Sequence, residues 1–164
     1  MRWKIPAALL LAVALLIPAT PAAAQAESPA TSCQAVFYAD IRELVTIDLD
    51  TASDIDVRVL ANRIMAAAVA DALTTLPGRM QARLDGSAGD LRAFLKTSLW
   101  GVWSTDLRIA VNRTMPNAGS HVQAAAQEAL DNGTVDAFLA YLNDGLYIAR
   151  ALDCAYQPAA SASA

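Results

Sequence analysis

The chain has 164 residues, of which 55% are hydrophobic and 17% are charged, and its formal net charge at pH 7 is −4. This length suits one domain with a single core. Because a phosphate backbone is bound by clustered Lys and Arg, the negative charge and the scattered basic residues argue against nucleic acid as a partner.

Residues 1–26 have the pattern of a secretory signal peptide. Two basic residues precede a short apolar run, and prolines and small residues follow it. The run is shorter than the roughly 20 residues of a membrane span, and the small residues after it fit a cleavage site. We expect cleavage between Ala26 and Glu27, or alternatively between Ala24 and Gln25. The mature protein is therefore predicted to be secreted.

The mature chain is predicted to hold one folded domain. Residues 27–32 form a disordered lead-in, residues 33–156 a single helical repeat domain, and residues 157–164 a disordered tail. No later apolar run approaches the roughly 20 residues of a membrane helix, so we expect no membrane span in the mature chain.

The two cysteines, Cys33 and Cys154, lie near the two ends of this domain. One pair of cysteines in an exported chain predicts a disulfide. Closing so long a loop would stabilise the fold by roughly 4–5 kcal/mol. Two free thiols or a metal site are the alternatives, but the single histidine leaves too few ligands for a metal centre.

Apolar residues recur at helical spacing, and no segment alternates as a strand does. In chain order we expect helices over residues 34–47 and 54–73, a short helical turn over 79–85, helices that start at Ser87, at Ser104 or Thr105, at Ser120 and at Thr134, and a last helix over 146–155. Gly101 and Gly145 are expected to break the helical pattern. Short helices joined by short loops predict an all-α fold of short antiparallel helix hairpins, packed as a small repeat array or bundle.

Four acids between Asp48 and Asp56 invite comparison with a calcium-binding loop. The sixth and twelfth positions of such a loop hold Ser53 and Val59, where calcium binding requires Gly and Glu. We interpret Ser53 and Asp56 instead as a capping box at a helix start.

Part of the chain repeats itself. Phe94-Leu95 and Phe138-Leu139 lie 44 residues apart, as do Gly101 and Gly145. A second pattern, which begins with Asp56, recurs 50 residues later from Asp106, and both aspartates are expected in first turns of helices. Periods of 40–50 residues are typical of helical repeat arrays.

The order of these motifs resembles the ALF repeats. The resemblance rests on a Leu-Asp-Gly-like turn, an acidic residue before Phe-Leu, a Gly, and Asp-x-Arg, and it covers about residues 56–153, best over 83–150. The family consists of short alanine-rich repeats of unknown function in exported proteins of high-GC Gram-positive bacteria. The first unit lacks the Phe-Leu pair. The resemblance implies a helical repeat fold and transfers no catalytic residue.

No motif for a catalytic, metal or cofactor site is found in the sequence. His121, the single histidine, is expected at a helix start and facing solvent. Trp100, Trp103 and Tyr147 are the candidate contacts for a partner or ligand, because large aromatic side chains are enriched in interfaces and ligand clefts. For the two tryptophans, burial in the core is the alternative.

Three functions follow from these observations. We favour a secreted, non-enzymatic helical repeat domain that binds an extracellular or cell-surface protein or serves as a scaffold. The alternative is a small exported carrier that holds a hydrophobic or haem-like ligand between helices. The weakest hypothesis is an enzyme that uses two carboxylates, as glycosidases do.

The predicted disulfide is tested by the mass of residues 27–164 after export into an oxidising compartment. Loss of two thiol hydrogens lowers the mass by about 2 Da relative to the reduced protein, as expected of an exported cysteine pair. An unchanged mass after reduction would exclude the Cys33–Cys154 bridge.

Overall fold

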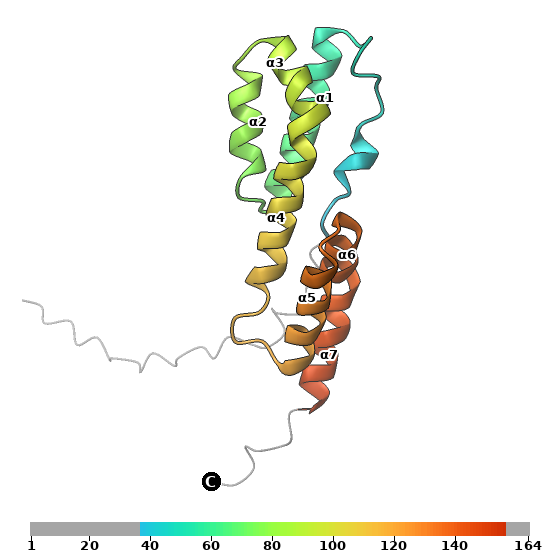
Figure 1. Cartoon of the computed structure of the whole chain (residues 1–164), viewed down its shortest axis with the longest axis vertical. Helices are drawn as coiled ribbons and strands as arrows, with labels where there is room; N and C mark the ends of the chain where they lie inside the picture. Colours follow the sequence, from blue (N-terminus) through green and yellow to red (C-terminus); the bar gives the residue numbers. More distant parts are fainter. Residues whose placement is uncertain (1–36, 157–164) are drawn as a thin grey trace, which may run out of the picture. The chain divides into compact units, whose positions relative to one another are not determined.

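The chain is helical through most of the part that the structure, a computed structural model, describes, residues 37–156 (Figure 1). The elements in chain order are the 3-10 turn η2 (Ile41–Leu44), the helices α1 (Asp54–Ala70), α2 (Leu76–Leu84) and α3 (Ala88–Ala93), the π-helical turn η3 (Phe94–Ser98), the helices α4 (Leu99–Arg113), α5 (Ser120–Asn132) and α6 (Val135–Ala140), the π-helical turn η4 (Tyr141–Gly145), and α7 (Leu146–Tyr156). No strand occurs among residues 37–156, and the predicted all-α class is confirmed for them.

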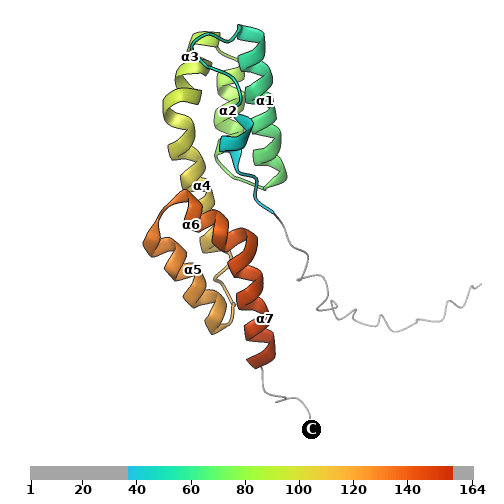
Figure 2. The same cartoon turned by 90° about the vertical axis from the view of Figure 1, so that its right-hand side faces the viewer.

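Two π-helical turns join shorter helices into longer ones. α3, η3 and α4 follow one another without a gap, and so do α6, η4 and α7 (Figure 2). The expected breaks at Gly101 and Gly145 are therefore wrong. A glycine inside a helix costs about 1 kcal/mol. Leu99 and Trp103, on either side of Gly101, are 0% and 1% exposed, and burying each such side chain contributes about 1.5–3 kcal/mol.

The helix expected over residues 34–47 is also wrong where the structure describes it. Only η2 is helical there, and the segment from Val45 to Ser53 is irregular. The guanidinium of Arg92, in α3, donates hydrogen bonds to the carbonyl oxygens of Leu49 at 2.8 Å and Ala52 at 2.6 Å. These carbonyl groups are satisfied by a side chain distant in sequence, so the segment does not need helical hydrogen bonds.

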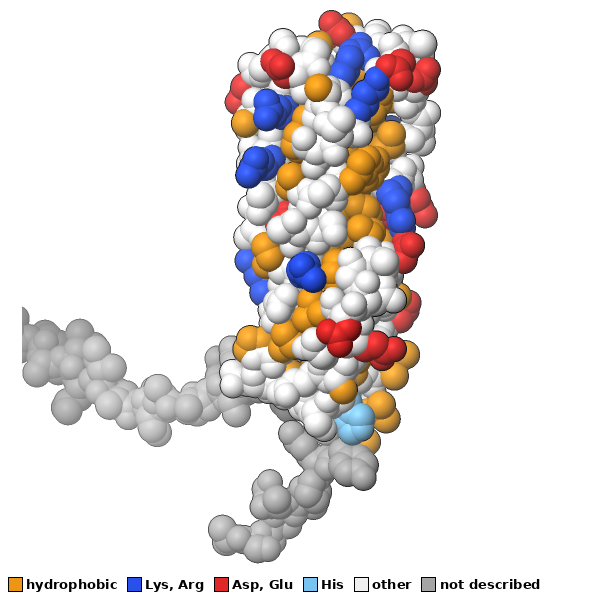
Figure 3. All heavy atoms as spheres, in the orientation of Figure 1, with side chains coloured by type: hydrophobic (Ala, Val, Ile, Leu, Met, Phe, Trp, Pro, Cys, Tyr) orange, Lys and Arg blue, Asp and Glu red, His pale blue; other side chains and the backbone are white. Residues whose placement is uncertain are grey.

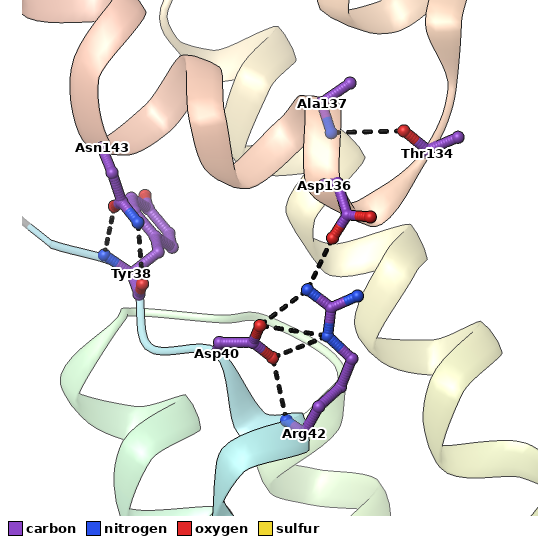
Figure 4. A network of polar contacts seen from close by, with 7 residues as sticks. All are labelled: Tyr38, Asp40, Arg42, Thr134, Asp136, Ala137 and Asn143. Carbon is purple, nitrogen blue, oxygen red and sulfur yellow. Dashed lines mark hydrogen bonds and ion pairs between the residues drawn. The ribbon is translucent and has the colours of Figure 1, made fainter.

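The start of the described chain is held against the last helices (Figure 4). The backbone N–H of Tyr38 donates to Oδ1 of Asn143 at 2.7 Å, and Nδ2 of Asn143 donates to the carbonyl oxygen of Tyr38 at 3.1 Å. Arg42 pairs with Asp40 and with Asp136 of α6, both at 2.6 Å. The hydrogen bonds from Arg42 lower the pKa of Asp40. The Arg42–Asp136 pair is exposed and is worth at most about 1 kcal/mol.

One cluster of apolar side chains from every helical segment forms the core. Its largest fully buried members are Trp103, Phe138, Ile41, Ile64, Leu76, Met80, Leu91, Leu95, Leu99, Leu107, Leu142 and Val57. Alanines interleave with these residues: Ala61 and Ala68 of α1 and Ala126 of α5 are each 0% exposed. Their small side chains allow neighbouring helices to approach closely, which explains why an alanine-rich chain packs without a wide apolar stripe on each helix.

Asp106, in the middle of α4, binds the N-terminus of α2. The backbone N–H of Thr75 lies 3.0 Å from both carboxylate oxygens of Asp106, and the N–H of Leu76 donates to Oδ2 at 2.7 Å. Thr75 itself makes no side-chain cap. Asp106 is 1% exposed. A buried carboxylate therefore satisfies N–H groups that a helix start would otherwise leave unpaired, and it adds a favourable charge at the positive end of the helix dipole.

Asp153 and Asp71 make related contacts. Asp153, in α7, accepts hydrogen bonds from the backbone N–H groups of His121 at 2.9 Å and Val122 at 3.1 Å, at the start of α5. Asp71, directly after α1, accepts one from Ala39 at 2.9 Å, just before η2. In each case an aspartate within or directly after a helix holds the start of an element 30–32 residues earlier.

The spacing of these aspartates corrects the repeat period expected from the sequence. Asp106 and Asp153 lie 47 residues apart, and so do the starts of η3 and η4. The periods of 44 and 50 therefore paired residues that do not occupy equivalent places. Asp56 lies in the first turn of α1 as expected, but Asp106 lies in the middle of α4.

Replacing Asp106 tests the importance of this cap. Asp106→Asn keeps the size of the side chain but removes the charge and turns an amide N–H₂ toward N–H donors. Since hydrogen bonds to a charged group are worth about 1.5–3 kcal/mol, we expect a loss of about 2–3 kcal/mol in the free energy of unfolding, measured by urea titration. The exposed Asp85→Asn is the control, with a change within about 0.5 kcal/mol. Equal midpoints for the two variants would contradict the role of Asp106.

Candidate functional site

The two candidate tryptophans lie together in α4. Their ring centroids are 6.3 Å apart at an interplanar angle of 62°, an edge-to-face pair. Trp103 is 1% exposed, and the guanidinium of Arg42 lies 5.9 Å from its ring centroid. Trp103 is therefore part of the core, as the alternative interpretation of the sequence expected. Trp100 is only partly buried.

Tyr147, the third candidate aromatic residue, lies in α7. It is partly buried, and the guanidinium of Arg150, one helical turn later, lies 5.8 Å from its ring centroid. This stacking places Tyr147 in a cation–π contact within its own helix.

His121 has a partner that the sequence did not indicate. Its Nδ1 lies 2.9 Å from Oδ1 of Asp153, the same oxygen that accepts the backbone N–H of His121. The His121 side chain is 37% exposed and that of Asp153 is 16% exposed. The expected cap, Ser120, makes no cap hydrogen bond, and Gly119 occupies the N-cap position. Asp153 thus takes the place of a local cap.

Gly119 is required at this helix start. A Cβ atom added to it would overlap the carboxylate of Asp153. A side chain at position 119 would therefore displace the aspartate that caps α5.

The surroundings of Asp153 and Asp71 shift the pKa values of the two carboxyl groups in opposite directions. Burial raises the pKa of Asp153, but hydrogen bonds from the N–H groups of His121 and Val122 and from the His121 side chain together bring it below the ordinary value. Burial raises the pKa of Asp71 above the ordinary value, and the single hydrogen bond from Ala39 only partly offsets this effect. The number of hydrogen bonds to the ionised carboxylate decides whether the pKa is lowered or raised.

Two shallow hollows lie beside the π-helical turns. The larger, about 290 Å³, lies between α5 and the α6–η4 segment; its lining includes Glu128, Ala129, Asn132, Ala140, Tyr141 and Gly145. The smaller, about 150 Å³, lies between α2 and the α3–η3 segment and is lined by Arg83, Asp90, Ala93, Phe94, Thr97 and Ser98. The sequence did not predict either hollow, because nothing in it marks where a helix takes a π-helical turn.

The charged and membrane-related features of the described residues are modest. Figure 3 shows basic and acidic side chains interspersed on the viewed face. Across residues 37–156, no group of three or more His, Cys, Asp or Glu side chains is placed to hold a metal ion. Within the same residues, no helix combines the length and the apolar character that crossing a membrane requires.

Comparison with known families supports the resemblance seen in the sequence. Residues 108–149 match the family model of ALF, short repeats of unknown function. This segment runs from the last part of α4 through α5, α6 and η4 into α7. The expected resemblance is confirmed over these residues, a narrower span than residues 56–153. No curated protein and no solved structure matches the chain.

The two aspartates give a pH prediction. Each titrates about an ordinary value of 3.8 when unperturbed. Because its folded-state pKa is lowered, Asp153 stabilises the fold above that value and loses this contribution as the pH falls through its folded-state pKa. Asp71 has the opposite sign, since its protonated form is favoured and the associated stability is lost as the pH rises through its raised pKa.

Carbon-13 NMR titration of the side-chain carboxyl groups would check these directions. We expect the midpoint of Asp153 below and that of Asp71 above the value that both share in concentrated urea. The reverse order in the folded protein would contradict the assigned hydrogen bonds.

Proposed function

We propose that this protein is an exported, non-enzymatic scaffold of repeated antiparallel helix pairs, which binds a protein partner outside the cell. The observation that carries the proposal is the recurrence, at 47 residues, of one framework of cap and π-helical turn. A framework that recurs while the side chains around it vary is what a repeat scaffold needs to present a surface.

The helix starts support a repeated unit. Hydroxyl groups of Ser53, Ser87 and Thr134 cap α1, α3 and α6 in the same way, each accepting the backbone N–H three residues later. The aspartate that holds the preceding element follows 18 residues after Ser53 and 19 residues after Ser87 and Thr134. The spacing of 19 is one residue longer because η3 and η4 lie within those two stretches, and a π-helical turn accommodates one extra residue. No such turn lies between Ser53 and Asp71. We infer three related units, the first of them reduced.

The acids support a structural role. Asp71 and Asp106 are the buried charged residues among those described, and both accept backbone N–H groups at element starts. Asp153 does the same for α5. Carboxylates committed to capping are not available as a catalytic acid and base, which supports a non-enzymatic role for the domain.

The carrier alternative receives less support. A small-molecule site buries most of its ligand in a cleft or cavity of roughly 300–1,000 Å³. The two hollows of about 290 and 150 Å³ are open to solvent. We therefore favour a surface that contacts a protein over a pocket that encloses a ligand.

Export and the Cys33–Cys154 disulfide remain part of the proposal. Cys154 is an exposed thiol in α7, and Cys33, like the signal peptide and its cleavage site, lies outside the described residues. From Asn143, which binds Tyr38, the helix reaches Cys154 after 11 residues, about 16 Å at 1.5 Å per residue. Five residues of extended chain between Tyr38 and Cys33 reach about 17 Å. This reach supports the predicted bridge.

The test of the proposed function is chemical crosslinking of tagged residues 27–164 at the surface of the producing cells, followed by reconstitution with the purified partner. We expect a protein adduct of defined stoichiometry that saturates, and a purified domain without bound small molecule. An unrelated exported helical domain with the same tag is the control. A co-purifying small molecule or visible absorbance would favour the carrier, and the absence of any specific adduct would contradict partner binding.

A further inference from the structure

The two hollows occupy equivalent places in successive helix pairs. Moving along the chain by 46 residues takes Arg83 of α2 to Ala129 of α5. Moving by 47 residues in the second helix takes Phe94 to Tyr141 and Ser98 to Gly145. Each hollow thus lies between the first helix of a pair and the π-helical turn of the second, above an aromatic ring.

The side chain of Arg83 occupies part of the first hollow. The guanidinium of Arg83 lies 5.8 Å from the ring centroid of Phe94, a cation–π contact. The space that remains beside it is about 150 Å³. A guanidinium group therefore fits at this position above the aromatic ring.

The second hollow lacks that arginine. Ala129 replaces it, and Gly145 replaces Ser98, and a hollow of about 290 Å³ remains beside Tyr141. Tyr141 is 5% exposed, and its hydroxyl group is hydrogen-bonded to Thr114 at 2.6 Å. That bond holds the ring in place as a fixed floor for the hollow.

The lining of the second hollow contains one acidic residue and no Lys or Arg. Burial raises the pKa of the Tyr141 hydroxyl group, and the charge of Arg150, in α7, partly offsets this effect. Glu128 lines the hollow and is exposed, and it takes part in none of the ion pairs found within residues 37–156. An exposed carboxylate in the lining of the hollow is complementary to a cationic side chain.

We propose that the hollow between α5 and η4 binds the guanidinium group of an arginine presented by a partner protein. The proposal rests on the proposed partner-binding function and names the chemistry of the contact. The guanidinium enters the hollow at the place that corresponds to Arg83 in the first helix pair, and its N–H groups reach the carboxylate of Glu128. Arginine fits better than lysine because its planar head forms paired hydrogen bonds to a carboxylate.

The first test uses the capped tripeptide acetyl-Ala-Arg-Ala-amide as the probe. Titrated into nitrogen-15-labelled residues 27–164, it should shift the backbone amides of Ala129, Tyr141 and Gly145 in a saturable way. The same peptide with citrulline, which keeps the shape and loses the charge, should bind at least about fivefold more weakly, since hydrogen bonds between two charged groups are stronger than those to a neutral one. The lysine peptide should bind about threefold more weakly. Equal binding of all three peptides would overturn the proposal.

Two variants test the hollows by filling the second and emptying the first. Ala129→Arg supplies the missing side chain, and we expect it to abolish the shifts at Tyr141. Arg83→Ala empties the first hollow and should add a second set of shifts at Phe94 and Ser98. Arg79→Ala, which removes an exposed arginine from the same helix α2, is the matched control and should add none.

Circular dichroism and thermal unfolding would establish that each variant is folded. If Ala129→Arg does not fold, Glu128→Gln replaces it, and the arginine peptide should then bind at least about threefold more weakly because the paired carboxylate is lost. Undiminished binding to a folded Ala129→Arg or to Glu128→Gln would overturn the proposal.

Crosslinking at the cell surface separates this inference from the proposed function. A partner captured by the unchanged domain but not by folded Ala129→Arg supports both. A partner captured equally by the two overturns the arginine contact and leaves partner binding intact. Specific peptide binding without any captured protein would contradict the partner-binding function while the affinity of the hollow for arginine stands.

Discussion

The contact between an aspartate carboxylate and the N-terminus of a neighbouring helix holds this fold together. Neither α2 nor α5 has a side-chain cap of its own, and Asp106 of α4 and Asp153 of α7 supply the missing acceptors. A helix start without acceptors leaves several N–H groups unpaired. The position of one helix end is therefore coupled to that of the other, and each pair is closed at one end by these bonds and at the other by a short turn.

Small residues make this coupling possible and also shape the surface. Gly119 leaves room for the carboxylate of Asp153, and buried alanines let the helices approach. The same small side chains leave a hollow of about 290 Å³ beside Ala129 and Tyr141. In this alanine-rich chain the close helix packing and the hollows thus come from the same choice of small side chains, and the larger side chain of Arg83 lines a smaller hollow of about 150 Å³.

Local signals in the sequence predicted local structure well. Ser53, Ser87 and Thr134 were expected at helix starts and are the caps there, because a cap depends on residues within one helical turn. Predictions that took a single residue as the end of a helix, without regard to the burial of its neighbours, were wrong. Gly101 was expected to end a helix, but the burial of Leu99 and Trp103 keeps the chain helical through it. The repeat period of 44 came from a Phe-Leu pair whose second copy occupies a different place.

The sequence by itself determined the all-α class, the helix starts that Ser53, Ser87 and Thr134 cap, and the resemblance to ALF repeats that the match over residues 108–149 supports. These depend on periodicity, caps and motif order, which are properties of neighbouring residues. Only the tertiary structure decided the role of Asp106, the pairing of His121 with Asp153 and the hollow between α5 and η4. The partners in these contacts lie about 10 to 30 residues apart, and their meeting follows from helix packing and from π-helical turns that no local pattern specifies.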